Sequence, residues 1–288
     1  MRQVFKFLFS LIFLALILYT VNNRYHLTDW LFFTGYADQT GNEQTFVNEI
    51  RSAMLNGLTE IELRFVGKVE NMEWFTEDAI DMVYEIDDKS TSSDYDYLRY
   101  KTNSIYAHIV GFGNILTITY EFEYNETAKE TSQVDETIKK LFQKWEINKL
   151  SDYEKIKKIH DYIIQNASYD TDTKHYSAYD NLIIKRSTCQ GYMSVAYKMF
   201  TEAGIPCRII TGTGNKDSHG WNIVKLDGKW YNIDCTWDDP LTSGGENIST
   251  YDYFLKSDED FKGHKRDEEF QKERFYENYI MSEVSYQE

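Results

Sequence analysis

Proline and cysteine are both scarce in this chain of 288 residues, which has two prolines and three cysteines. The cysteines, Cys189, Cys207 and Cys235, share no C-x-x-C spacing, so the sequence indicates neither a cysteine-rich zinc site nor a disulfide framework. An odd number of cysteines also leaves at least one thiol without an internal partner. That thiol is a candidate reactive group.

Positive charge is scarce as well. The chain has 31 lysines and arginines against 47 aspartates and glutamates, for a net charge of −16 at pH 7. An acidic surface repels polyanions, so the composition argues against nucleic acid as a partner. What the chain does have is apolar material: 42% hydrophobic and 16% aromatic residues are enough for a substantial core in one or two domains.

One long apolar run, FLFSLIFLALILYTV at residues 7–21, follows Arg2 and Lys6 and precedes Arg24. Its length is short for a spanning helix and typical of a signal peptide. No small-x-small triplet follows it, which favours a retained anchor over cleavage. We therefore expect residues 1–24 to be a signal-anchor or signal peptide. The protein would then be a single-pass protein of the cell membrane with its catalytic domain extracellular, or secreted if the segment is cleaved.

Residues 30–148 are predicted to form a small α+β accessory module that carries no chemical motif. Helical periodicity predicts helices, and alternation of apolar and polar residues predicts strands. The predicted helices cover residues 43–58, about 76–84 and 132–145. The predicted strands are TEIELRF and a hairpin made of YDYLRYKTNSIYAHIV and NILTITYEFEY.

A second unit, residues 150–288, begins where Ser151 and Glu154 have the spacing of a capping box. Within this unit, the stretch STCQGYMSVAYKMFTEAGIP has apolar residues at helical spacing and ends in a glycine and a proline. Ser187 or Thr188 is the expected N-cap, which places Cys189 in the first turn.

The first turn of a helix has unpaired N–H groups and the positive end of the helix dipole. These favour a thiolate at Cys189 and can also receive an oxyanion. Taken alone, Cys189 fits a small buried residue equally well, because free cysteines are among the most buried residues.

The dipeptide Asp227-Gly228 lies between two apolar runs in SHGWNIVKLDGKWYNIDCTWDDP, which predicts a hairpin with a two-residue turn. Leu226 then pairs with Lys229. The same register places His219 opposite Thr236 and makes Asp234 its diagonal neighbour on the same face.

Diagonal neighbours lie about 7–8 Å apart at the backbone, so the side chains of His219 and Asp234 can touch. Cys235 falls on the opposite face of the strand, and Cys207 begins a strand with nothing to ionise it. Cys189 is therefore the nucleophile candidate by elimination.

Two other histidines compete with His219 for the role of base. His160 shares a helical face with apolar residues, which favours packing, and His175 lies in a polar loop. Neither has an orienting carboxylate on a predicted strand, so His219 is preferred. Trp221, Trp230 and Trp237 lie near the predicted site, where they form core or shield a thioester from water.

Several segments together resemble the transglutaminase-like superfamily, in its bacterial branch, over residues 150 to 265. They are KIKKIHDYIIQNASYD, AYDNLIIKRSTCQGY, GIPCRIITG, HGWNIVKLDGKWYNIDCTWDDP and YFLKSD. The resemblance implies an α+β, papain-like core in which a nucleophile helix packs on an antiparallel sheet. It also implies a catalytic triad of Cys189, His219 and Asp234.

This chain departs from the family pattern at three positions. Ser187 and Thr188 stand where members often have glycine and a small apolar residue, and Gly220 stands where they often have alanine. These changes affect the approach to the thiol, and hence substrate preference, more than the triad. Gln190 belongs to the matched CQGY motif, either to assist the oxyanion or to pack.

The resemblance implies a cysteine acyltransferase or hydrolase that acts on protein or cell-wall peptide amides through a thioester. The outcome would be crosslinking, deamidation or peptide-bond cleavage. With the apolar N-terminal run, the enzyme would be membrane-tethered and extracellular. No calcium loop or other metal pattern is present, so no metal or cofactor is expected. The alternatives are a catalytically silent cell-surface binding module of the same fold and a structural surface protein.

Overall fold

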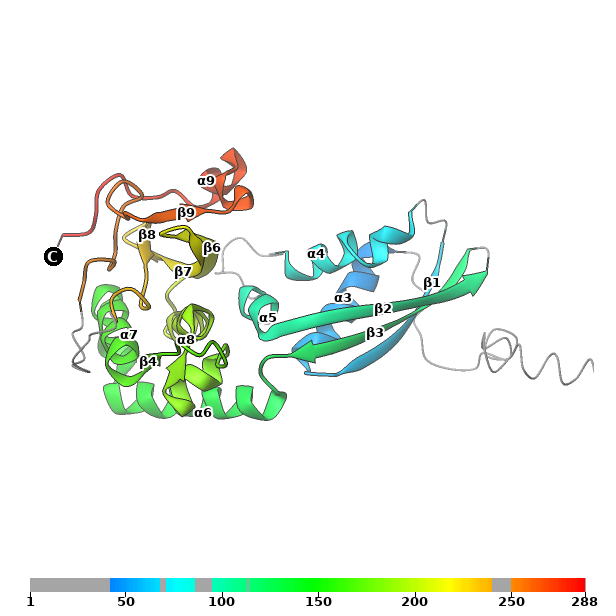
Figure 1. Ribbon diagram of the computed structural model, residues 1–288, viewed down its shortest axis with the longest axis horizontal. Coiled ribbons are helices and arrows are strands. Elements are labelled where there is room, and N and C mark those ends of the chain that lie inside the picture. The colour runs from blue at the N-terminus through cyan, green and yellow to red at the C-terminus, as the bar shows by residue number, and fades with distance from the viewer. Residues whose placement is uncertain (1–41, 68–70, 86–94, 113, 240–249, 288) are drawn as a thin grey trace, which may run out of the picture.

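The computed structural model describes residues 42–67, 71–85, 95–112, 114–239 and 250–287 (Figure 1). Its helices are α3 (Glu43–Leu55), α4 (Asp78–Tyr84), α5 (Asp96–Lys101), α6 (Ala128–Trp145), α7 (Asp152–Asn166), α8 (Cys189–Glu202) and α9 (Glu273–Asn278). Its strands are β1 (Glu60–Val66), β2 (Thr102–Phe112), β3 (Ile115–Tyr124), β4 (Ser168–Tyr169), β5 (Arg186–Ser187), β6 (Cys207–Gly214), β7 (Asp217–Leu226), β8 (Lys229–Ile233) and β9 (His264–Arg266). Shorter 3₁₀ or π turns are η1 (Met72–Phe75), η2 (Ile147–Lys149), η3 (Asp180–Ile184) and η4 (Glu268–Gln271).

The described residues form an antiparallel sheet of order β1-β3-β2, a second antiparallel sheet of order β8-β7-β6-β9, and a short parallel pair of β4 with β5. Figure 1 shows the first sheet with α3 and α4 at one end of the long axis, and α6, α7 and α8 with the second sheet at the other. Helices beside antiparallel sheets confirm the predicted α+β class.

The β2–β3 hairpin forms as expected, but the prediction of a strand for the preceding segment YDYLRYK is wrong. Residues 96–101 form helix α5 instead. The carboxylate of Asp96, at the start of α5, accepts hydrogen bonds from the Arg208 guanidinium at 2.7 and 3.1 Å and from the Ile209 N–H at 2.9 Å. These long-range bonds to β6 outweigh the alternating pattern of the local sequence.

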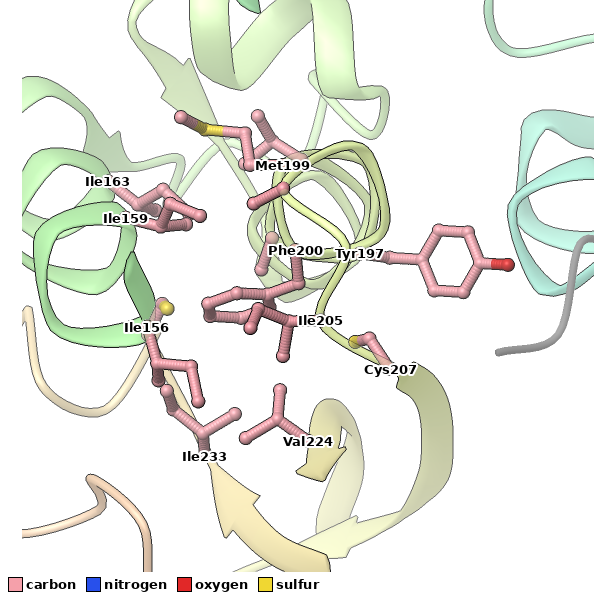
Figure 2. Close-up of a cluster of buried hydrophobic side chains, with 14 of the residues drawn as sticks. Ile156, Ile159, Ile163, Tyr197, Met199, Phe200, Ile205, Cys207, Val224 and Ile233 are labelled. Carbon is pink, nitrogen blue, oxygen red and sulfur yellow. The ribbon is translucent and has the colours of Figure 1, made fainter. Parts of the chain in front are cut away.

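The core of the second unit lies between α7, α8 and the sheet β8-β7-β6-β9 (Figure 2). Phe200 of α8 points toward Ile156 of α7, with Val224 and Ile233 of the sheet close by, whereas Tyr197 points away from the cluster. Since all five residues are at most 4% exposed, the packing fixes the position of α8 on the sheet.

Helix α6 also packs into this core, through Val134, Ile138 and Phe142. Helices α6 and α7 each begin with a capping box. The one at the start of α7 is the predicted pair of Ser151 and Glu154. The division of the chain into units at residues 30–148 and 150–288 stays a prediction.

The predicted location in the cell membrane needs correction. Of the residues that the structure describes, none belongs to a helix long and apolar enough to cross a bilayer. The longest, α6, has 18 residues and alternates apolar positions with charged ones. The apolar run at residues 7–21, on which the single-pass and extracellular assignment rested, lies outside the described residues.

We predict that Asp96→Ala lowers the free energy of unfolding by about 3–5 kcal/mol, because it leaves the Arg208 guanidinium buried without its carboxylate. Urea denaturation followed by circular dichroism measures this change. The control is Glu136→Ala in the exposed pair of Glu136 and Lys140, which is expected to stay close to the wild type. Equal stability of the Asp96 and Glu136 variants would contradict the prediction.

Candidate active site

Cys189 is the first residue of α8, and Thr188 is its N-cap. The Thr188 side chain makes no capping hydrogen bond to the helix, in contrast to the capping boxes that begin α6 and α7. The N–H groups of Cys189 and Gln190 have no carbonyl to reach within the helix. The first turn of α8 thus presents uncapped N–H groups next to the thiol.

The chain before α8 is held by a short network around Asp170. Its carboxylate accepts from the N–H groups of Asp172, Lys174 and His175, contacts the His175 ring at 2.8 Å, and pairs with Arg186 at 2.6 Å. The carbonyl of His175 in turn accepts from the Thr188 N–H at 2.8 Å. His175, one of the competing histidines, therefore supports the start of α8.

Gly191, in the first turn of α8, is required by a close approach. A Cβ at this position would lie 2.4 Å from the Ser187 Cβ and 2.7 Å from the Ser177 carbonyl oxygen. Any larger residue would push the chain before Cys189 off the helix. The Gln190 side chain beside it donates to the Tyr100 carbonyl of α5 at 2.8 Å, so it packs against α5.

The predicted hairpin register is observed for five pairs, from Leu226 with Lys229 to Asn222 with Ile233. The strands do not continue to the expected pairing of His219 with Thr236. Strand β8 ends at Ile233 because the Asp234 carboxylate accepts from two N–H groups ahead of it, those of Thr236 at 2.8 Å and Trp237 at 3.2 Å. The side chain thereby turns the backbone away from the ladder.

His219 and Asp234 are nevertheless in contact: His219 Nε2 lies 2.7 Å from Asp234 Oδ2, and both side chains are buried. Burial alone would lower the pKa of His219, but hydrogen bonds and charge from Asp234 and Cys189 raise it to about 10. Burial would raise the pKa of Asp234, but His219 and a second histidine hold it well below its usual range. The structure therefore brings the three predicted site residues together, because His219 interacts with both Asp234 and Cys189.

The other two cysteines are buried, at 0% exposure for Cys207 and 3% for Cys235. Burial raises the pKa of both thiols well above the usual value, which disfavours their thiolates. Cys189 is only partly buried. Of the three thiols, it is the one that contacts a histidine and solvent.

His160 is completely buried and packs against Phe254, with ring centroids 4.8 Å apart. The prediction that it packs is confirmed. Its Nε2 also lies 3.0 Å from the carboxylate of Asp238, a partner in a turn rather than on a strand. His160 thus belongs to the interior of the protein and not to the site.

A cavity of about 350 Å³ opens beside His219. Trp237 stacks on the His219 ring at 5.3 Å between centroids, so this tryptophan forms a wall of the site, whereas Trp221 is core and Trp230 packs against Tyr279. The residues that line the cavity are Tyr169, Asn215, His219, Thr236, Trp237, Asp239 and Tyr253.

Gly220 follows His219, and its lack of a side chain has a physical reason. A Cβ there would lie 2.4 Å from the sulfur of Met193 in α8. The small residue therefore lets the buried Met193 side chain pack against the strand that carries the histidine. Met193 thus explains why glycine stands at position 220, where members of the family often have alanine.

The sequence did not point to His264 of β9, whose Nε2 lies 3.0 Å from the same Asp234 oxygen. No local pattern in residues 262–266 identifies it, because the contact spans 30 positions of the chain. The ligating atoms of His219, Asp234 and His264 lie within 4.8 Å of one another. These are metal-binding residue types, but the distances of 2.7 and 3.0 Å from Asp234 Oδ2 are those of hydrogen bonds.

Comparison with known proteins places this arrangement in a class. Residues 119–235 match the family model described as the transglutaminase-like superfamily, which confirms the predicted resemblance to that superfamily for this part of the chain. The match contains Cys189, His219 and Asp234 and ends just after the aspartate.

Two curated relatives are similar to part of the chain. The kyphoscoliosis peptidase of Homo sapiens is 29% identical over 151 residues, and that of Mus musculus is 28% identical over 121 residues. These regions cover 45% and 36% of this chain, but only 22% and 18% of the relatives. The chain thus spans about a fifth of the length of the curated relatives that it matches.

Among solved structures, one described as a TGase is 15% identical, with a TM-score of 0.35 over 68% of this chain and 58% of the other. Another, described as a "putative cysteine protease" from Cytophaga hutchinsonii, is 16% identical, with a TM-score of 0.32 over 46% of this chain and 62% of the other.

We predict that the His219 ring titrates near pH 10 and that Asp234→Asn shifts its pKa down toward the unperturbed value of about 6.5. Because the folded-state pKa is raised, the stability that the protonated ring contributes is complete below about pH 6.5 and is lost as the pH rises through about 10. NMR of histidine labelled with ¹³C in the ring measures the midpoint.

Asp239→Asn serves as the control, because the Asp239 carboxylate lines the same cavity but accepts from Tyr192 at 2.5 Å. It is expected to leave the His219 midpoint near pH 10. A midpoint in the Asp234→Asn variant equal to that of the wild type would show that Asp234 does not stabilise the imidazolium.

Proposed function

We propose that the protein is a cysteine acyltransferase or hydrolase that acts on amides of protein or peptide substrates through a thioester on Cys189. The observation that carries the proposal is the interaction of the His219 ring with both Asp234 and Cys189, each of which raises its pKa. A protonated ring next to a thiol stabilises the thiolate, which is the form that attacks carbonyl carbons.

The proposed reaction begins when the Cys189 thiolate attacks the carbonyl carbon of a carboxamide or peptide bond. The negative charge moves to the carbonyl oxygen, which the uncapped N–H groups in the first turn of α8 would stabilise. His219 then gives its proton to the leaving nitrogen. The carbon–nitrogen bond breaks, ammonia or an amine departs, and the acyl group remains on the sulfur as a thioester.

The second half of the reaction regenerates the thiolate. Water or an amine gives a proton to the now neutral His219 and attacks the thioester, and the carbon–sulfur bond breaks. Attack by an amine transfers the acyl group and forms a crosslink, whereas attack by water completes deamidation or cleavage. Trp237 and Tyr253 line the cavity beside His219, where aromatic side chains would favour an amine over water in this step.

We predict that iodoacetamide at neutral pH modifies Cys189 and leaves Cys207 and Cys235 unmodified in the folded protein. The reason is the contact of Cys189 with His219 and the burial of the other two thiols. His219→Ala is expected to slow the modification of Cys189 by about 100-fold, since it removes the protonated ring that stabilises the thiolate. Mass spectrometry of peptides assigns the modified position. Slow modification that is the same in both proteins would favour a silent binding module.

We predict further that the full chain converts a glutamine-containing peptide and that Cys189→Ala does not. Intact-mass measurement of the peptide, with and without a primary amine, identifies the reaction. An increase of about one mass unit means deamidation, an adduct with the amine means transfer, and fragments mean peptide-bond cleavage. Absence of any conversion in peptides that contain glutamine, asparagine or ordinary peptide bonds would overturn the proposal.

A further inference from the structure

Asp234 has two imidazole partners and not one. Its Oδ2 lies 2.7 Å from Nε2 of His219 and 3.0 Å from Nε2 of His264, and its Oδ1 accepts from the N–H groups of Thr236 and Trp237. Both carboxylate oxygens are therefore occupied, at a residue that is 1% exposed.

The ring of His264 is enclosed by aromatic side chains. Its side chain is 2% exposed, and its ring centroid lies 3.9 Å from that of Phe261 and 4.1 Å from that of Trp237. Nδ1 of the ring faces the carbonyl oxygen of Lys262 at 3.1 Å. The ring is thus fixed in plane and direction, with Nε2 aimed at Asp234.

Because a carboxylate oxygen accepts hydrogen bonds and does not donate them, Nε2 of His264 carries the hydrogen of this contact. The strand pairing of the backbone holds the His264 ring in this position. His264 is in β9, where it pairs with Gly214 of β6, and the neighbouring Gly212 of β6 pairs with His219 of β7. The two histidines therefore approach Asp234 from strands on either side of β6.

Strand β9 is itself anchored beneath the site. Arg266, two residues after His264 and only 8% exposed, donates to Asn232 at 3.0 Å and to Asp258 at 2.7 Å. Asn232 belongs to β8, next to the turn that begins at Asp234. The strand that carries His264 is therefore tied to the strand that leads to Asp234.

We propose that His264 is a positioning residue of the site: its Nε2–H holds the Asp234 carboxylate in the orientation in which the same oxygen accepts from His219. The proposal rests on the function proposed above, because its effect is on the His219 ring that serves Cys189. A carboxylate fixed by one histidine and two N–H groups cannot rotate when the proton on His219 moves, so the ring returns to the same place in each turnover.

The alternative is that His264 only fills the aromatic enclosure, in which case another ring of similar size serves as well. Three variants separate these roles. His264→Phe keeps a ring and removes both nitrogens. The amide nitrogen of His264→Gln reaches the place of Nε2, whereas that of His264→Asn reaches the place of Nδ1, which faces Lys262.

The experiment measures the rate at which iodoacetamide modifies Cys189 in the full chain between pH 5 and 10, with the site of modification assigned by mass spectrometry. We expect His264→Phe and His264→Asn to be slower than the wild type by about 10-fold at neutral pH, and His264→Gln to be within about 3-fold of it. Thermal melting compares the folding of the variants. The expected order of the modification rates does not follow the size of the substituted side chain.

A rate for His264→Phe equal to that of the wild type, while His219→Ala is slow, would overturn this inference and leave the proposed function intact. Equal rates for all of these proteins, including His219→Ala, would overturn the proposed function itself. A wild-type rate that changes on addition of EDTA or Zn²⁺ would show a metal at His219, Asp234 and His264, and would also overturn the inference.

A measurement on the wild type does not depend on how the variants fold. If His264 donates to Asp234, proton NMR of protein labelled with ¹⁵N in histidine shows a His264 Nε2–H resonance shifted downfield and lost in Asp234→Asn. A bare Nε2 on His264 in the wild type at neutral pH would refute the proposed hydrogen bond.

Discussion

The buried carboxylate of Asp234 is the constraint on which the site depends. A charge at 1% exposure is tolerated only where hydrogen bonds and opposite charge replace water. Here two N–H groups fill one oxygen and two imidazoles fill the other. The same bonds end β8, turn the chain toward Trp237, and draw β7 and β9 to one point. The hydrogen bonds that make the buried Asp234 carboxylate tolerable are therefore the same ones that orient His219. A substitution that removes these bonds also removes the orientation of the ring.

The position of the Cys189 thiol has a different cause, which is the apolar packing of α8 on the sheet. Phe200 and Met193 place α8 on the sheet, and Gly220 and Gly191 allow the close approaches at its first turns. Among the residues that the structure describes, the hydrogen-bonded partners of Asp234 reach α8 through the pair of His219 and Cys189. Packing thus sets the distance between helix and sheet, while the polar cluster sets the direction of the ring. The two can be perturbed separately, because the core and the cluster share few side chains.

Features with a local cause were predictable from the sequence. The Asp227-Gly228 turn fixed the register, the capping box of Ser151 marked the start of α7, and the stretch before Gly204 marked the end of α8. Features with a distant cause were not. Helix α5 depends on a bond from Asp96 to a strand more than a hundred residues away, and His264 reaches Asp234 across 30 positions. Even the correct contact of His219 with Asp234 arises from a turn at Asp234 and not from the extended ladder that predicted it.

The charge state of the ring determines the order of events in the proposed reaction. A serine protease triad begins with a neutral histidine that must first remove a proton from the hydroxyl. With a pKa of about 10, His219 already carries its proton across the neutral range, so in the proposed reaction it acts as an acid from the start. The difficult step is then the transfer of that proton from His219 to the leaving nitrogen, because Asp234 stabilises the protonated ring and makes it a weaker acid. A partner that shares the charge of Asp234 makes the ring a stronger acid, and His264 is placed to do so. The second histidine would thus set how readily the first gives up its proton as well as where it stands.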